Sequence, residues 1–271
     1  MPKNDANILD IRRNGGFQTL RMTFAPANAF DPCLLSALRR ALDQAVNDEN
    51  IAAIVLTSGL RIFSAGGDAK WMGQQLAARG PQGLVDEFNQ IMNQFRELCL
   101  EIRRCPLLVI AALNGHTLGG GLELAAACDM RFVADAEGLQ IGVPEMDLFG
   151  VMPSGGGGTQ FITRLMGPSR ALNFIFNAKP VNPSQAYAIG LVDRLCDPAK
   201  LLSDAETFAA EVANKAGRIG VAACKRAVFE GVEMPIAQAL EFDRSLHWDA
   251  MRRGNFPKRA DDFARRFGAR Q

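Results

Sequence analysis

The chain has 271 residues and a formal net charge of +1, and 48% of its residues are hydrophobic against 22% charged. This length allows one large domain or a main domain with an appendage, and the composition is that of a globular protein with a sizeable buried core. The near-zero charge argues against a nucleic-acid partner, and the apolar runs are too short to span a bilayer.

The first half of the sequence alternates between strand and helix patterns. Asp31 can cap a helix and Pro32 suits its first position, and the run IAAIVLTSG is typical of a strand covered on both faces. The elements expected up to residue 113 are two short strands within 7–24, a helix within 31–50, a strand at 51–59, a glycine-rich loop at 61–72, a long amphipathic helix at 81–105 and a strand at 107–113. This order predicts an α/β architecture.

The second half becomes mostly helical. One or two strands are expected at 131–142, and helical patterns dominate from about Ser169. We place a soft boundary near residue 197, with a core at 1–197 and a helical region at 198–271. In the last 20 residues, seven Lys or Arg against two Asp give +5, which leaves −4 for the rest of the chain. Such a tail is either a solvated helical face or a contact for an anionic ligand or a neighbouring subunit.

The six cysteines form no CxxC pair, and the N-terminal residues lack the apolar core of a secretory signal. We therefore expect reduced cysteines, a cytoplasmic location and no membrane partner.

Several common catalytic sites are excluded by pattern. His116 and His247 are the only histidines, and no Cys, His or Asp cluster has the spacing of metal ligands. Ser64 and Ser154 do not lie in the G-x-S-x-G motif of a hydrolase nucleophile. The glycine runs are not followed by the Lys and Ser or Thr of a P-loop. We expect no metal site.

The glycines point to another device. The stretch NGHTLGGGLELAAACD runs three glycines into an apolar helix pattern, and SAGGD follows the strand at 51–59. A helix N-terminus offers unpaired N–H groups, and glycine lets a ligand approach the backbone. Two such N–H groups converging on one oxygen would form an oxyanion hole. Plain loop geometry is the alternative interpretation of both turns.

Two carboxylates accompany these turns. Glu123 lies among Leu and Ala residues in the apolar stretch, and Glu145 follows a proline in GVPEMDLFG. Burial would raise the pKa of each carboxyl toward the range useful for proton transfer. Together with an oxyanion hole they would form an acid/base apparatus beside a carbonyl. Spacing alone does not show whether they lie close together.

The combination of motifs resembles the crotonase (enoyl-CoA hydratase/isomerase) superfamily over nearly the whole chain. The matching segments are PANAFD, IFSAGGDAKWM, NG-x-x-x-GGG-x-E-L, IGVPE, GGTQ, RLMGPSRAL and QAYAIGLVDRL, in the family's order. The resemblance implies a spiral of ββα units followed by C-terminal helices that build a homotrimer or a hexamer. It also implies an acyl-CoA thioester substrate and no separate cofactor, because coenzyme A is part of the substrate.

The resemblance further implies roles for individual residues. The backbone N–H groups of Ala65 and Gly120 would form the oxyanion hole, and Glu123 and Glu145 would be the catalytic pair. The substrate-binding segments would comprise Ala65, Gly66, Gly67, Asp68, Gly119 and Gly120. Asp68 would fix its turn rather than take part in the chemistry.

Retention of both glutamates favours an enoyl-CoA hydratase within this superfamily. The chain is about two residues longer than the family pattern on each side of Glu145, so Asp147 could face the substrate instead. The longer loop leaves open isomerisation, hydrolysis of an acyl-CoA thioester or dehalogenation, and, from another class, a non-catalytic acyl-CoA-binding scaffold. We expect His116 to be a packed, hydrogen-bonded residue, and Arg265 and Arg266 to be solvated.

Overall fold

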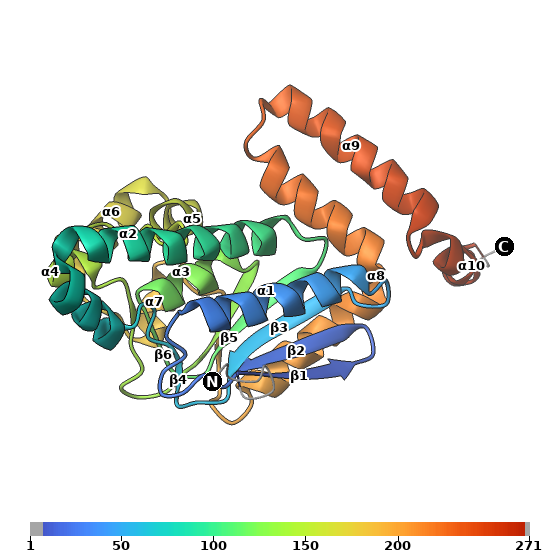
Figure 1. Ribbon diagram of the computed structural model, residues 1–271. Coiled ribbons are helices and arrows are strands. Elements are labelled where there is room, and N and C mark those ends of the chain that lie inside the picture. The colour runs from blue at the N-terminus through green and yellow to red at the C-terminus, as the bar shows by residue number, and fades with distance from the viewer. Residues whose placement is uncertain (1–7, 269–271) are drawn as a thin grey trace.

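The computed structural model describes residues 8–268 as an α/β body with helices extending from it (Figure 1). The strands are β1 (Leu9–Asn14), β2 (Phe17–Met22), β3 (Ala53–Ser58), β4 (Ile62–Ser64), β5 (Leu108–Leu113), β6 (His116–Leu118), β7 (Met130–Ala134), β8 (Ile141–Gly142) and β9 (Arg194–Cys196). The helices are α1 (Pro32–Asn47), α2 (Ala69–Arg104), α3 (Gly120–Ala127), α4 (Glu145–Phe149), α5 (Gly158–Met166), α6 (Pro168–Asn177), α7 (Pro183–Ala188), α8 (Leu201–Gly231), α9 (Ile236–Arg253) and α10 (Phe256–Phe267).

The main sheet has six strands in the order β1-β2-β3-β5-β7-β9. The two short strands predicted within 7–24 are β1 and β2, which pair as an antiparallel hairpin, and the other pairings are parallel. Every residue of β3 is buried, as expected for a strand covered on both faces. The helix at α1 is confirmed with the predicted cap, because the side chain of Asp31 accepts from the Leu34 N–H and Pro32 takes the first turn.

A second sheet of three short parallel strands, β4-β6-β8, distinguishes this fold from a simple α/β sheet. Each of its strands follows a strand of the main sheet and precedes a helix, so the chain repeats strand, strand, helix three times from β3 to α4. These three repeats are the ββα spiral that the family resemblance implies. The segments are too short to show a period, so the sequence indicates a loop where β4 lies and no strand where β6 lies.

Helix α2 begins earlier than expected. The segment 61–72 was interpreted as a loop, but α2 starts at Ala69, where the side chain of Asp68 caps it by accepting from the Trp71 N–H. A break at Gly80, with φ of +69°, divides the helix into two arms. The amphipathic helix predicted at 81–105 forms the second arm, and its buried residues are Phe95, Leu98, Cys99 and Ile102.

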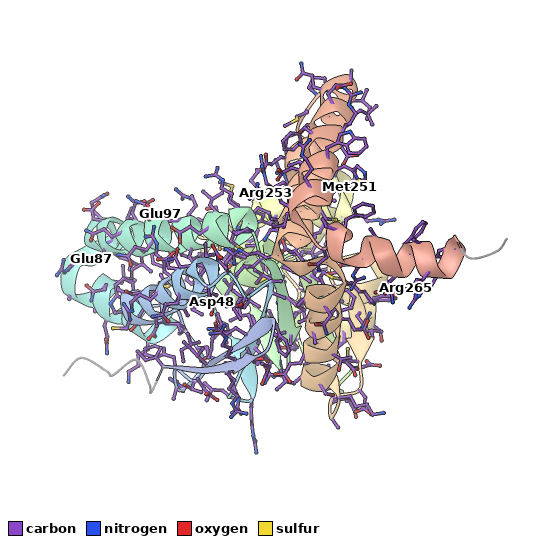
Figure 2. All side chains as sticks on the ribbon, turned by 90° about the vertical axis from the view of Figure 1, so that its right-hand side faces the viewer. Asp48, Glu87, Glu97, Met251, Arg253 and Arg265 are labelled. Atoms are coloured by element: carbon purple, nitrogen blue, oxygen red, sulfur yellow. The ribbon has the colours of Figure 1, made fainter. Side chains whose placement is uncertain are left out.

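The C-terminal helices fall into two parts. Leu201, Ala205 and Ala209 of α8 belong to the main core, so the start of α8 packs with the sheet, and the division at residue 197 stays a prediction. Helices α9 and α10, here called the C-terminal arm, extend away from the body (Figure 1), and α9 has no buried residue. Figure 2 shows Arg253 at the end of α9 and Arg265 on α10, far from Glu87 on α2.

No helix within residues 8–268 is long and apolar enough to cross a membrane.

Candidate active site

The two glycine turns identified in the sequence meet in space. A Cβ added to Gly66, whose φ is +80°, would lie 2.5 Å from the amide nitrogen of Gly120, and one added to Gly121 would lie 2.6 Å from the carbonyl oxygen of Ser64. Gly119 also has a positive φ, of +53°. Since L residues avoid this backbone region and no side chain fits the contact, both turns require glycine. The segment after β4 and the start of α3 are therefore in direct backbone contact.

The amides of these turns differ in availability. The N–H of Ala65 donates to the carbonyl oxygen of Ala27 at 3.0 Å, so it is already engaged. The N–H of Gly66 donates to the hydroxyl oxygen of Ser64. The amides of Gly67 and Gly120 have no hydrogen-bond partner among residues 8–268. Ala65 was predicted to provide a free oxyanion donor. This prediction is wrong, because the Ala65 N–H already donates to the carbonyl oxygen of Ala27.

A residue that the sequence interpretation missed organises the first turn. Asn28 is fully buried and has φ of +47°, a conformation that asparagine tolerates better than most residues. Its side-chain NH₂ group donates to the Ser58 hydroxyl at 2.7 Å and to the Phe63 carbonyl oxygen at 2.9 Å. Its backbone carbonyl oxygen accepts a hydrogen bond from the Ser64 hydroxyl. The signal for it in the sequence is the Asn of PANAFD, one of the segments that resemble the family.

Glu123 lies in the first turn of α3 with 2% of its surface exposed. Its Oε2 accepts hydrogen bonds from the backbone N–H groups of Gly156 at 2.6 Å and Gly158 at 2.9 Å. We call these two N–H groups the amide cradle. Burial raises the pKa of Glu123, and the cradle opposes that effect because it stabilises the charged form. The buried carboxylate thus has partners, which were not visible in the sequence.

The cradle depends on glycine at two positions. A Cβ added to Gly158 would lie 2.9 Å from Cγ of Glu123, and one added to Gly156 would lie 2.6 Å from the ring of Phe95. The run PSGGGGTQ, which matched no phosphate-binding motif, instead brings the backbone at the start of α5 close to a carboxylate. A helix N-terminus suits this, because its unpaired N–H groups and dipole favour negative charge.

Glu145 has the opposite environment. It is half-buried at the start of α4, and its Oε2 is shielded from solvent with no hydrogen-bond partner among the described residues. Burial, with a further contribution from the charge of Glu123, raises the pKa of Glu145 to about 7. Its Oε1 lies 2.9 Å from where a Cβ on Gly119 would be. Asp147 is exposed, so it is Glu145 that faces the glycine turns.

Two other predicted residues have structural contacts. Asp68 caps α2, a contact that fits the expectation of a residue that fixes its turn. His116 accepts a hydrogen bond at Nδ1 from the Gln140 N–H at 3.1 Å, but it is exposed rather than packed. Among the side chains that the structure describes, no group of three or more His, Cys, Asp or Glu residues is placed to hold a metal ion.

Comparison with known proteins identifies the family. The sequence model of the enoyl-CoA hydratase/isomerase family matches residues 13–266. The chain belongs to this family. The resemblance drawn from the GGG-x-E-L, PE and GGTQ motifs is therefore confirmed, and with it the fold and the assignment to this family of enzymes.

Individual relatives in the enoyl-CoA hydratase/isomerase family agree in sequence and in fold. The crotonyl-CoA hydratase of Syntrophomonas wolfei is 34% identical over 217 residues, covering 80% of this chain and 78% of that protein. The short-chain-enoyl-CoA hydratase of Clostridium acetobutylicum is 34% identical over 218 residues, covering 80% and 78%. The solved enoyl-CoA hydratase of Bacillus anthracis superposes with a TM-score of 0.80 at 27% identity, over 88% of this chain and 89% of that one.

Proposed function

We propose that the protein is an enoyl-CoA hydratase, which adds water across the 2,3 double bond of a 2-enoyl-CoA. The observation that carries this proposal is the pair of glutamates with contrasting environments beside two unpaired backbone amides. Glu123 accepts hydrogen bonds from the amide cradle, which favour its ionised form, whereas Oε2 of Glu145 has no partner among the described residues and burial raises the pKa of Glu145 to about 7. One base and one acid next to an oxyanion site are the groups that hydration of a conjugated thioester requires.

The oxyanion hole in this proposal is formed by the amides of Gly120 and Gly67. Gly120 begins α3, so its N–H lies at the positive end of the helix dipole. Gly67 replaces Ala65 in the role expected from the sequence, because the Ala65 amide already binds Ala27. Gly66 and Gly119 bring the two turns together, and the thioester oxygen would accept both hydrogen bonds as its negative charge develops.

The acid/base steps follow from the protonation of the pair. Glu123 accepts a proton from water, the resulting hydroxide oxygen bonds to the β carbon, and the π electrons move to the thioester oxygen as an enolate. Glu145 then gives its proton to the α carbon as the enolate collapses, so one water is added in total. Transfer of a proton from Glu123 to Glu145 restores the starting state. Because the thioester itself accepts the electrons, the proposed reaction uses no cofactor beyond the coenzyme A of the substrate.

The proposed assembly is a homotrimer or a pair of trimers. Apolar side chains of the C-terminal arm and the preceding turn are exposed in the single chain, including Val232, Ile236, Leu240, Phe263 and Phe267. Exposed apolar surface of this extent is typical of protein interfaces. Sedimentation of the purified protein would give its mass, and a monomer at micromolar concentration would contradict the proposed assembly.

The direct test is to mix purified protein with crotonyl-CoA and follow the loss of the conjugated thioester absorbance. We expect turnover by the wild-type protein and the 3-hydroxyacyl thioester as product. A panel of enoyl-CoA thioesters of different chain length extends the test to the preferred substrate. Migration of the double bond without water uptake would favour an isomerase, and release of free coenzyme A would favour a thioester hydrolase. Binding without turnover on the whole panel would contradict an enzymatic role.

A further inference from the structure

Arg103 lies in the last turn of α2 and takes no part in the reaction proposed above. It is half-buried, and its Nη2 donates a hydrogen bond of 2.9 Å to the carbonyl oxygen of Ala126 in the last turn of α3. Carbonyl groups at a helix C-terminus lack partners within the helix, and a cation is favoured there. Arg103 therefore binds α3 at the end opposite to Gly120.

The same guanidinium packs on two aromatic rings. Its Cζ lies 5.2 Å from the ring centroid of Phe161 on α5 and 4.0 Å from that of Phe229 on α8. Both distances are within the range in which a cation is attracted to a ring face. One side chain thus contacts α3 through a hydrogen bond and α5 through a stacked ring.

These contacts lie one helical turn from the amide cradle. On α3, Ala126 follows Glu123 by three residues, and on α5, Phe161 follows Gly158 by three residues. Residues three apart are neighbours on the same face of a helix. The hydrogen bond between Glu123 and Gly158 and the link through Arg103 therefore join the same two helices at successive turns.

We propose that Arg103 is a positioning residue, whose contacts with α3 and α5 fix the spacing at which the amide cradle reaches Glu123. The catalytic readout rests on the proposed function, whereas the spacing is a property of the folded chain. Arg131 also binds this end of α3, through the carbonyl oxygen of Cys128, but it pairs with Asp193 rather than with a residue of α5. Of these two arginines, it is Arg103 whose contacts extend from α3 to α5.

Loss of this link would lengthen the cradle hydrogen bonds. Because those bonds lower the pKa of Glu123 against the effect of burial, their weakening raises that pKa. The other ionisable groups that face Glu123 are Cys99 of α2 and Glu145 of α4, and they stay in place in the variants below. The acid limb of the kcat/KM profile, which reports ionisation of Glu123 in the proposed reaction, then moves to higher pH.

The main experiment compares Arg103→Met with Arg104→Met. Both substitutions remove one positive charge at the end of α2, but Arg104 is exposed. With crotonyl-CoA as substrate, we expect Arg103→Met to lower kcat by about 10- to 100-fold, with KM changed less than about twofold, since a misplaced catalytic group costs about this much. Its acid limb moves upward, whereas Arg104→Met retains the wild-type kcat and profile.

Two further variants separate geometry from charge and from folding. Arg103→Lys keeps the charge but loses the planar group, and Phe161→Leu keeps an apolar side chain but loses the ring. We expect both to shift kcat and the acid limb in the direction of Arg103→Met, by smaller amounts. Full wild-type behaviour in Arg103→Lys, or an Arg103→Met protein with lower thermal stability but unchanged kcat and acid limb, would overturn the proposal. If Arg103→Met does not fold, these two variants decide by the same criteria.

A separate measurement distinguishes this proposal from the proposed function. Titration of the protein with ¹³C-labelled glutamate carboxyls, followed by NMR, reports the pKa of Glu123 without substrate. We expect a higher pKa in Arg103→Met than in the wild-type and Arg104→Met proteins. An unchanged pKa overturns the positioning role even if the enzyme is a hydratase, and absent turnover in the wild-type protein overturns the hydratase role alone.

Discussion

The regions around Glu123 and Glu145 lie beside the same glycine turns but hold their carboxyl groups in different ways. Glu123 is on α3, whose residues from Gly121 to Ala127 are all buried, and it accepts two backbone hydrogen bonds. Glu145 begins α4, a helix of five residues with none buried, and its Oε2 has no partner among the described residues. One carboxyl is held in the core, and the other is attached to a short surface helix.

This difference shows how one fold can provide a base and an acid from two residues of the same type. Both carboxyls lose solvation, which raises the pKa of each, but the amide cradle of another segment opposes this effect at Glu123, whereas at Glu145 only the residue's own backbone does so. The negative charge of Glu123 also raises the pKa of Glu145. Pairs of titratable groups in contrasting environments are the usual basis for assigning acid and base roles.

Removing the base should have the largest effect. Glu123→Gln keeps the shape of the side chain but not its proton affinity, so we expect kcat for crotonyl-CoA hydration to fall by about 10³-fold. Steady-state assays measure the loss, and a binding assay with crotonyl-CoA should show nearly unchanged affinity. A variant that retains more than about a tenth of the activity would mean that Glu123 is not the base.

A methyl group in the cradle should have the next largest effect. In Gly158→Ala the new Cβ would lie 2.9 Å from Cγ of Glu123, so the carboxylate must move, and we expect kcat to fall by about 10²-fold. Gly155→Ala is the matched control, because its Cβ would lie 3.5 Å from the nearest atom, an ordinary contact. Equal losses in the two variants would contradict the importance of the cradle.

The pH profile tests the acid. With a pKa of about 7, Glu145 loses its proton as the pH rises through that value, so kcat/KM should fall about tenfold per unit above it. Ionisation of Glu123, whose pKa is raised from its usual value, should set the acid limb. In Glu145→Gln the residual activity should lack the basic limb. If that limb persists, another group supplies the proton.

The stability of Glu145→Gln should depend on pH. Because the folded pKa of Glu145 lies above its unfolded value, the folded state binds the proton more tightly, and the wild-type protein loses that contribution as the pH rises from about 4.5 to about 7. At pH 8 the variant should therefore be more stable by about 1–3 kcal/mol, and at pH 4 the two should be alike. Urea unfolding at both pH values measures the difference, and equal stability at pH 8 would mean that the carboxyl is well solvated.

Asp147→Asn should have the smallest effect. Asp147 follows Glu145 by two residues on α4 and is exposed, so we expect kcat and KM to change by less than about twofold, as for surface changes away from a site. The same crotonyl-CoA assay checks this result. A loss comparable to that of Glu145→Gln would exchange the roles of the two acids.

Much of the fold followed from local patterns. The strand at IAAIVLTSG is a continuous apolar run and the helix capped by Asp31 is long enough to show its period, and both were predicted. Strands β4 and β6 have three residues each, too few for a pattern, and they form because flanking segments bring them side by side. The start of α2 was missed because Gly66 and Gly67 precede it and Gly80 interrupts it.

The sequence by itself determined the family, the two glycine turns and the two glutamates, because these are residue identities at fixed spacing. The tertiary structure decided which groups are available. It engaged the Ala65 amide with Ala27, left the Gly67 amide unpaired, and gave Glu123 the cradle from a loop more than 30 positions further along the chain. Hydrogen-bond partners and desolvation depend on atoms that are distant in sequence, so the folded chain sets which carboxyl holds a proton.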